Sequence, residues 1–142
     1  MNWKSTLMLS GIGVLMGLAA VFGLTRSLEG PLWLVIGVGC SLWIARRLVR
    51  PFLHGFWVGL VGGAAATVIQ AVFYSTYLER NPGQAVSVQD LPWNLSPRAF
   101  VLAVAPVSGL MSGLMLGLLS WLSSKLIGKK HRVSSVEAGS RA

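Results

Sequence analysis

Residues 6–24 read TLMLSGIGVLMGLAAVFGL, a run of nineteen residues without a charged side chain. An α-helix rises about 1.5 Å per residue, so a run of this length spans roughly 28 Å, close to the thickness of the hydrocarbon core of a bilayer. Lys4 precedes the run, as in a secretory signal peptide, but the run is long for such a peptide and residues 19–23 contain no clean cleavage site. We therefore interpret the run as a retained transmembrane helix.

The composition of the whole chain is typical of a membrane protein. Of its 142 residues, 54% are hydrophobic and only 11% are charged, and the mean hydropathy is +0.66. A soluble domain carries about 25% charged residues, so this chain has too little polar surface to cover a water-soluble globule. A soluble enzyme, a disordered chain and a nucleic-acid-binding protein with a basic face are thereby excluded. The single Cys40 cannot form an internal disulfide.

Four apolar runs divide the chain into predicted transmembrane spans. Pro31 is a favoured first residue for the second helix, and Ser96 is a suitable N-cap for the fourth. The spans are expected at residues 6–24, 31–49, 52–78 and 97–126, with an outer loop at 79–95 and a basic, disordered cytoplasmic tail at 127–142. The sequence thus predicts an all-α fold, a single domain over residues 1–126 in which four antiparallel transmembrane helices form a bundle.

The distribution of basic residues predicts the orientation of this bundle. One side of the membrane would hold nine of the twelve Lys and Arg residues, namely Lys4, Arg46, Arg47, Arg50, Lys125, Lys129, Lys130, Arg132 and Arg141. The other side would hold three, Arg26, Arg80 and Arg98. Because cytoplasmic loops are enriched in Lys and Arg, both termini are predicted to be cytoplasmic. The seven cations Arg46, Arg47, Arg50, Lys125, Lys129, Lys130 and Arg132 are candidate topology anchors or contacts for anionic lipid.

Small residues recur at intervals of four in three of the predicted spans. These candidate helix-packing residues are Gly13 and Gly17 in the first span, Gly55, Gly59 and Gly63 in the third, and Gly109, Gly113 and Gly117 in the fourth. A spacing of four places such residues on one helix face, where two backbones can approach closely. The stripes are expected either to pack the bundle internally or, for the fourth span, to remain free for a second copy or a partner helix.

Two polar residues and one proline lie deep in the predicted spans. Gln70 is the most polar side chain there, and Thr67 lies one turn before it. An unpaired amide is costly in hydrocarbon, so Gln70 should bond to another helix or to water. Both residues are candidates for helix glue or for a polar lining. Pro106 removes a backbone donor inside the fourth span and predicts a kink.

Charged residues are missing from the apolar cores of the four predicted spans. Their absence argues against transport coupled to protons or cations through an acidic centre, and against an intramembrane metalloprotease. His54 and Cys40 have no partners at a recognisable catalytic or metal-ligand spacing. The sequence therefore predicts no catalytic residue, no metal site and no cofactor.

Two functional hypotheses follow, both for a multi-pass protein of the cell membrane, specifically a bacterial inner membrane. In the first, the chain is a non-enzymatic interaction or accessory subunit that meets a partner membrane protein, or a second copy, through its Gly-rich helix faces. The alternative is a small homo-oligomeric channel or transporter with Gln70 and Thr67 in its water path. In both, the lipid bilayer surrounds the protein and nucleic acid is not a partner.

Overall fold

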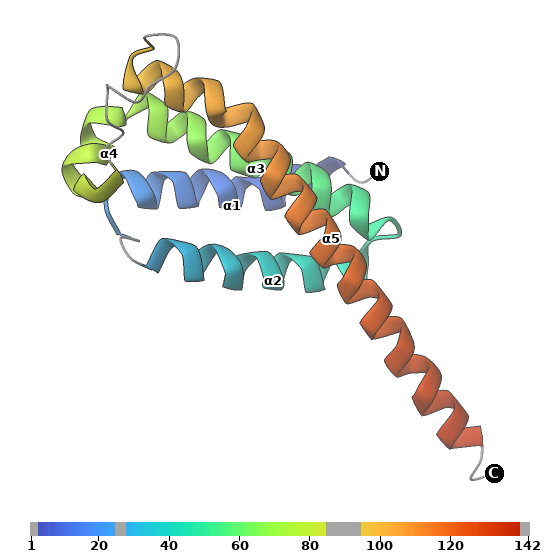
Figure 1. Ribbon diagram of the computed structural model, residues 1–142. Helices are drawn as coiled ribbons and strands as arrows, with labels where there is room; N and C mark the ends of the chain where they lie inside the picture. Colours follow the sequence, from blue (N-terminus) through green and yellow to red (C-terminus); the bar gives the residue numbers. More distant parts are fainter. Residues whose placement is uncertain (1–2, 25–27, 85–94, 140–142) are drawn as a thin grey trace.

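The computed structural model of the chain describes residues 3–24, 28–84 and 95–139, and the side chains up to residue 128 apart from Gln84. Within these residues the secondary structure is entirely helical (Figure 1). The elements are α1 (Trp3–Val21), α2 (Glu29–Arg47), α3 (Pro51–Val72), the short α4 (Tyr74–Arg80), a 3-10 turn η2 (Pro82–Gln84) and α5 (Pro97–Gly139).

Three of these helices are long and apolar enough to cross a membrane: α1, α3 and the part of α5 from Pro97 to Gly128. They make the chain compatible with a membrane protein. The fourth predicted span, α2, has the same 19-residue length as α1 but begins with Glu29 and ends with Arg46 and Arg47. Because these charged residues make α2 less apolar, it is not among the three helices.

The helix α3 lies at the centre of the packing. Its most extensive contact is with α5, and α1 packs against another of its sides. The remaining long helix, α2, contacts mainly α5, and it makes no substantial contact with α1. In Figure 1, α1, α2 and α3 run side by side while α5 crosses them obliquely and projects beyond them at its C-terminal end.

Glycine residues allow the close approach of α3 to its two neighbours. A Cβ atom built on Gly13 of α1 would collide with the backbone of Gly62, and one built on Gly17 would lie 2.8 Å from the Cα atom of Ala66. Between α3 and α5, a Cβ on Gly59 would collide with the backbone of Ser112. Adding even one carbon at these positions forces the helices apart.

The glycine stripe of α5 is used inside the chain. A Cβ atom on Gly109 would lie 2.7 Å from the carbonyl oxygen of Leu60, and one on Gly113 would lie 2.7 Å from that of Phe56. For Gly117, the nearest atom is the carbonyl oxygen of Phe52, at 3.1 Å. This stripe faces α3, so in this arrangement it is not free for a second copy or a partner helix.

The first and third spans end earlier than the apolar runs suggest. α1 stops at Val21 because Gly23 adopts a left-handed conformation with φ of 69°. The amides of Gly23 and Leu24 donate to the carbonyl oxygens of Ala20 and Ala19, both at 3.0 Å, which is the Schellman arrangement that terminates a helix.

The third span is interrupted at Phe73, where ψ is 35°. The chain then turns into α4, which packs against the end of α1. Just after α4, the Asn81 amide donates to the Ala20 carbonyl oxygen at 2.9 Å. This bond supplies a partner for a carbonyl group at the C-terminal end of α1 and holds α4 over that end.

The predicted cytoplasmic tail begins at residue 127, within the last helix, and its disorder stays a prediction. The helix α5 continues to Gly139, and residues 140–142 lie outside the described part. Between residues 129 and 138 the sequence contains no Pro or Gly, so no local breaker ends the helix there. Of the expected outer loop, residues 79–80 belong to α4 and 82–84 to η2, while 85–94 lie outside the described part.

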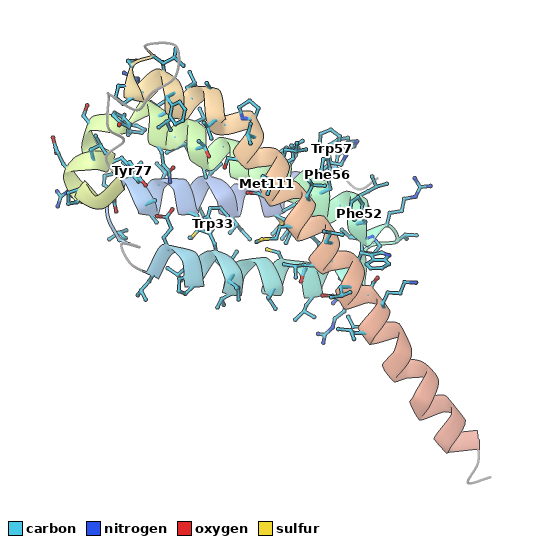
Figure 2. The ribbon with its side chains drawn as sticks, in the orientation of Figure 1. Trp33, Phe52, Phe56, Trp57, Tyr77 and Met111 are labelled. Atoms are coloured by element: carbon cyan, nitrogen blue, oxygen red, sulfur yellow. The ribbon has the colours of Figure 1, made fainter. Side chains whose placement is uncertain are left out.

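An aromatic cluster marks the end of the molecule at which α1 and α3 begin. The ring of Trp57 lies 5.7 Å from that of Trp3 and 6.0 Å from that of Phe56, and Phe52 stacks on Phe56 at 6.3 Å. Figure 2 shows Phe52, Phe56 and Trp57 projecting at this end of α3. Large aromatic rings are typical of the level of the lipid headgroups.

Candidate functional site

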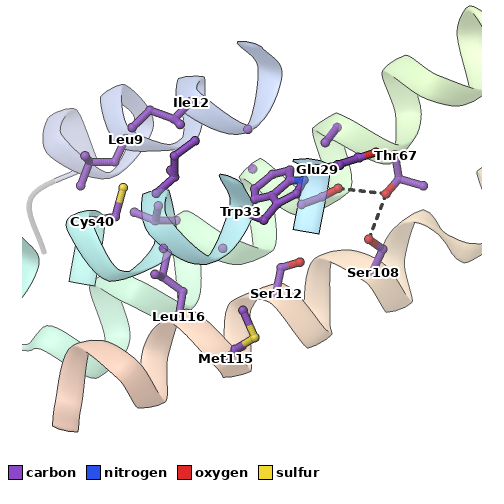
Figure 3. Close-up of a pocket in the computed structure, with 18 of the residues that line it drawn as sticks. Leu9, Ile12, Glu29, Trp33, Cys40, Thr67, Ser108, Ser112, Met115 and Leu116 are labelled. Atoms are coloured by element: carbon purple, nitrogen blue, oxygen red, sulfur yellow. Dashed lines mark hydrogen bonds between the residues drawn. The ribbon is translucent and has the colours of Figure 1, made fainter. Parts of the chain in front are cut away.

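A cavity of about 290 Å³ lies between α1, α2, α3 and α5 (Figure 3). Two of these helices, α1 and α2, make no substantial contact with each other. An apolar cavity of about 150 Å³ is enough to hold benzene, so this space is suited to a ligand about twice as large. Its lining is mainly apolar and includes a small number of polar side chains, which is the usual composition of a ligand pocket.

The α2 wall of the cavity carries a carboxylate. Because α2 begins at Glu29 rather than at Pro31, Glu29 is a helical residue. Trp33, Ile36 and Cys40 follow it at intervals of four, three and four, which places all four on one helix face. All four line the cavity. Glu29 lies outside the predicted second span at 31–49 and was therefore not considered as a residue of the bundle.

Glu29 meets Gln70 across the cavity. The Gln70 amide nitrogen Nε2 donates to Glu29 Oε1 in a long hydrogen bond of 3.5 Å. Glu29 also acts on Tyr77 of α4, whose pKa is raised above its ordinary value of 10.0, first by burial and then by the negative charge of Glu29 and by Tyr74. Among the residues that the structure describes, no Lys, Arg or His side chain forms an ion pair with Glu29.

The α3 and α5 walls contribute hydroxyl groups. Thr67 Oγ1 forms hydrogen bonds of 2.9 Å with Ser108 Oγ and of 3.1 Å with the carbonyl oxygen of Gly63. Ser112 lies one turn beyond Ser108 on α5 and also lines the cavity. Figure 3 shows Thr67, Ser108 and Ser112 along one side of the space. Gln70 and Thr67, the two residues that the sequence singled out, are thus bonded to neighbouring helices and also face the cavity.

Beyond Cys40, the packing closes around an apolar cluster. Cys40, Val58 and Leu116 belong both to the cavity lining and to the buried cluster that includes Ile44. On the far side of this cluster, the hydroxyl groups of Ser41 and Ser123 lie 3.3 Å apart. Glu29 and Cys40 are eleven residues apart on one helix, so the cavity extends roughly 16 Å along α2 from its polar end to its apolar end.

The other predicted residues lie away from the cavity. Arg46, Arg47 and Arg50 are exposed at the end of α2 and just after it. Lys125 is exposed and its Nζ lies 5.6 Å from the centre of the Trp121 ring, whereas the side chains of Lys129, Lys130 and Arg132 lie outside the described part. Pro106 is an exposed residue within α5, which continues as one helix through it.

Sequence reasoning missed four of the polar or aromatic residues that line the cavity: Glu29, Trp33, Ser108 and Ser112. For α2, the signal was the regular spacing from Glu29 to Cys40, which becomes visible only when the helix is extended back to Glu29. For α5, Ser108 and Ser112 are four residues apart and one position before Gly109 and Gly113. They therefore lie beside the glycine stripe, on the edge of the face that meets α3.

Within the described residues, no three His, Cys, Asp or Glu side chains come together in a way that could hold a metal ion. Comparison with known proteins gives no match: no protein-family model, no curated protein and no solved structure matches this chain. The class that the fold and the cavity define is a small helical protein compatible with a membrane, with a ligand-sized space between its helices.

Proposed function

We propose that this chain is a four-span integral membrane protein that reversibly binds a small molecule in the cavity beside α2, without catalysing a reaction. The observation that carries the proposal is the meeting of Glu29, Gln70 and Thr67 along a largely apolar cavity between the helices, with Glu29 at the first residue of α2. Polar side chains such as Gln70 and Thr67 are costly within the apolar part of a span unless they are bonded, and an apolar cavity lined by a few polar groups is typical of a ligand site. Binding of this kind is the first step of a transporter or a channel.

In this proposal α2 is the fourth span. It is as long as α1, packs against α5 and runs beside the other helices (Figure 1). Its terminal arginines, Arg46 and Arg47, would extend along their apolar stems to the headgroups. With Arg50 and Lys125 they support an orientation in which both termini are cytoplasmic, in a bacterial inner membrane.

The glycine stripe of α5 was the most favoured partner surface in the accessory-subunit hypothesis. Gly109, Gly113 and Gly117 are used against α3, so association with a partner would require a different helix face. The cavity, in contrast, supports the channel or transporter alternative directly. Its polar end lies where Glu29 begins α2, which in the proposed orientation is the outer side of the membrane.

Thiol accessibility tests the proposal. A Gln70→Cys variant in a Cys40→Ser background is treated with a small, membrane-impermeant thiol reagent in cells and in inverted membrane vesicles. We expect labelling from the outer side, because Gln70 lines the polar end of the cavity. The matched control is Ala71→Cys in the same background, since Ala71 is the next residue on α3 but is 2% exposed and does not line the cavity.

The control variant should remain unlabelled. Gln70→Cys that is inaccessible from both sides of the membrane would overturn the proposal of a water-accessible binding cavity. Labelling from the cytoplasmic side alone would overturn the proposed orientation.

A further inference from the structure

We propose that the cavity binds an organic cation that carries an apolar group about the size of one aromatic ring, with its positive charge beside Glu29 and Trp33. This inference rests on the proposed function, because it requires a cavity that ligands can enter. It adds the chemical class of the ligand and the residues that recognise it.

One end of the cavity carries a negative charge. Among the described residues that line the cavity, Glu29 is the only charged one. Its described hydrogen-bond partner is the uncharged amide of Gln70, at 3.5 Å. Glu29 is half-buried at the first residue of α2. A carboxylate can accept several hydrogen bonds, so one long bond from an amide leaves Glu29 able to accept further bonds from a cationic ligand.

The second feature is the position of Trp33. It follows Glu29 by one helical turn on the same face of α2 and also lines the cavity. Figure 3 shows the Trp33 ring and Glu29 at the same end of the pocket. The face of an indole ring attracts cations, and organic ammonium groups are recognised by this combination of an aromatic face and a carboxylate. A small inorganic cation holds its water more tightly, so it would gain less from the ring than an organic ammonium ion.

The third feature is the apolar remainder of the lining. Apart from the polar residues and Trp33, the larger side chains that line the cavity are apolar and include Leu9, Ile12, Ile36, Met115 and Leu116. Burying an apolar group there is favourable by about 25 cal/mol per Å². The volume of about 290 Å³ is at the lower end of the range for ligand pockets, which limits the apolar group to roughly one ring.

The test measures equilibrium binding to the full-length chain in phosphatidylcholine nanodiscs, with empty nanodiscs as background. The probe is radiolabelled benzyltrimethylammonium, an aromatic ring with a quaternary ammonium group. Neopentylbenzene serves as the competitor of matched shape, because it replaces the charged nitrogen by carbon. Phenylmethanesulfonate serves as the anionic competitor.

Variants locate the site. Glu29→Gln removes the charge and keeps the shape, and we expect it to weaken binding of the cation at least about tenfold. Trp33→Leu should weaken binding by roughly two- to fivefold. Glu29→Asp should retain most of the binding, which controls for a folding defect. The matched control is Glu79→Gln, because Glu79 is an exposed acid on α4 outside the cavity.

We expect the cation to bind saturably, and neither competitor to displace it at equal concentration. Equal competition by neopentylbenzene, or unchanged binding to Glu29→Gln, would overturn the inference. These results would leave the proposed function standing if Gln70→Cys is still labelled from the outer side. Failure of that labelling would overturn both.

Discussion

Replacing Gly59 by Ala tests the packing on which the whole arrangement depends. Gly59 lies where α3 crosses α5, and a Cβ atom there would collide with the backbone of Ser112 and lie 2.8 Å from the Cα atom of Gly113. These are backbone atoms, so no side-chain rotation can relieve the collision. For the 2.8 Å contact alone to reach 3.4 Å, the lower end of ordinary contact, the helices must part by about 0.6 Å, and the closer collision with Ser112 requires more.

A gap of this size forfeits about a quarter or more of the attraction between the atoms that line it. Overpacking of a well-filled interface costs about 1–3 kcal/mol, and we expect Gly59→Ala to lower the free energy of unfolding by this amount. The greater helix propensity of Ala offsets little, because a transmembrane helix remains helical when it separates from its neighbours.

The assay is reversible unfolding of the purified protein in bicelles by sodium dodecyl sulfate, followed by circular dichroism and tryptophan fluorescence. Gly39→Ala is the matched control, because a Cβ atom at Gly39 would meet no heavy atom within 4 Å. Its effect should stay within about 0.5 kcal/mol. The reasoning is refuted if Gly59→Ala is as stable as the native chain, or if the two variants are equally destabilised.

Three further predictions concern other parts of the molecule. Ser120 Oγ is buried without a hydrogen-bond partner among the described residues, so Ser120→Ala should raise the free energy of unfolding by roughly 1 kcal/mol in the same assay; a clear loss of stability would contradict this. The pKa of Tyr77 is raised above 10.0, so the stabilisation linked to the neutral Tyr77 side chain is complete below pH 10.0 and is lost as the pH rises through the pKa of the folded protein. Glu29→Gln should bring that pKa closer to 10.0. Absorbance titration of tyrosinate in a Tyr74→Phe background measures the change, and an unaltered titration curve would refute the influence of Glu29. The proposed orientation, with both termini cytoplasmic, predicts that a fluorescent protein fused after Ala142 fluoresces and that an alkaline phosphatase fused there is inactive; active phosphatase would reverse the orientation.

The sequence was sufficient to predict the helical class because its apolar runs are long and free of charge. It was less informative about where helices end. The run through Leu78 is continuous in hydropathy, yet α3 ends at Val72 because α4 turns over the end of α1 and bonds to it through Asn81. This contact joins residues far apart in the chain, so no local pattern predicts it.

The site was predictable in part. The polarity of Gln70 and Thr67 identified them as residues that require partners, but polarity alone does not say which helix supplies the partner. Glu29 fell between the first two predicted spans because Pro31 is a favoured first helical residue, and helix boundaries defined by such signals are uncertain by one or two residues. That shift of two residues left out of the predicted helix the one charged residue among the described residues of the cavity lining.

The glycine stripes illustrate a similar limit. Spacing of four shows that a helix has a face suited to close approach, but it does not identify the helix that approaches. The stripe of α5 is matched by Phe52, Phe56 and Leu60 on α3, whose backbone atoms it contacts. Only the three-dimensional arrangement distinguishes this internal use from association with another protein.

The central claim is that a cation enters the cavity and is held there by Glu29, and protection from labelling tests it most directly. The rate at which Gln70→Cys, in the Cys40→Ser background, reacts with the thiol reagent is measured with and without benzyltrimethylammonium. We predict that the cation slows the reaction saturably when Glu29 is present, and that at least about ten times more cation is needed for the same protection when Glu29→Gln is added. A reaction rate that the cation leaves unchanged in both chains would contradict the claim.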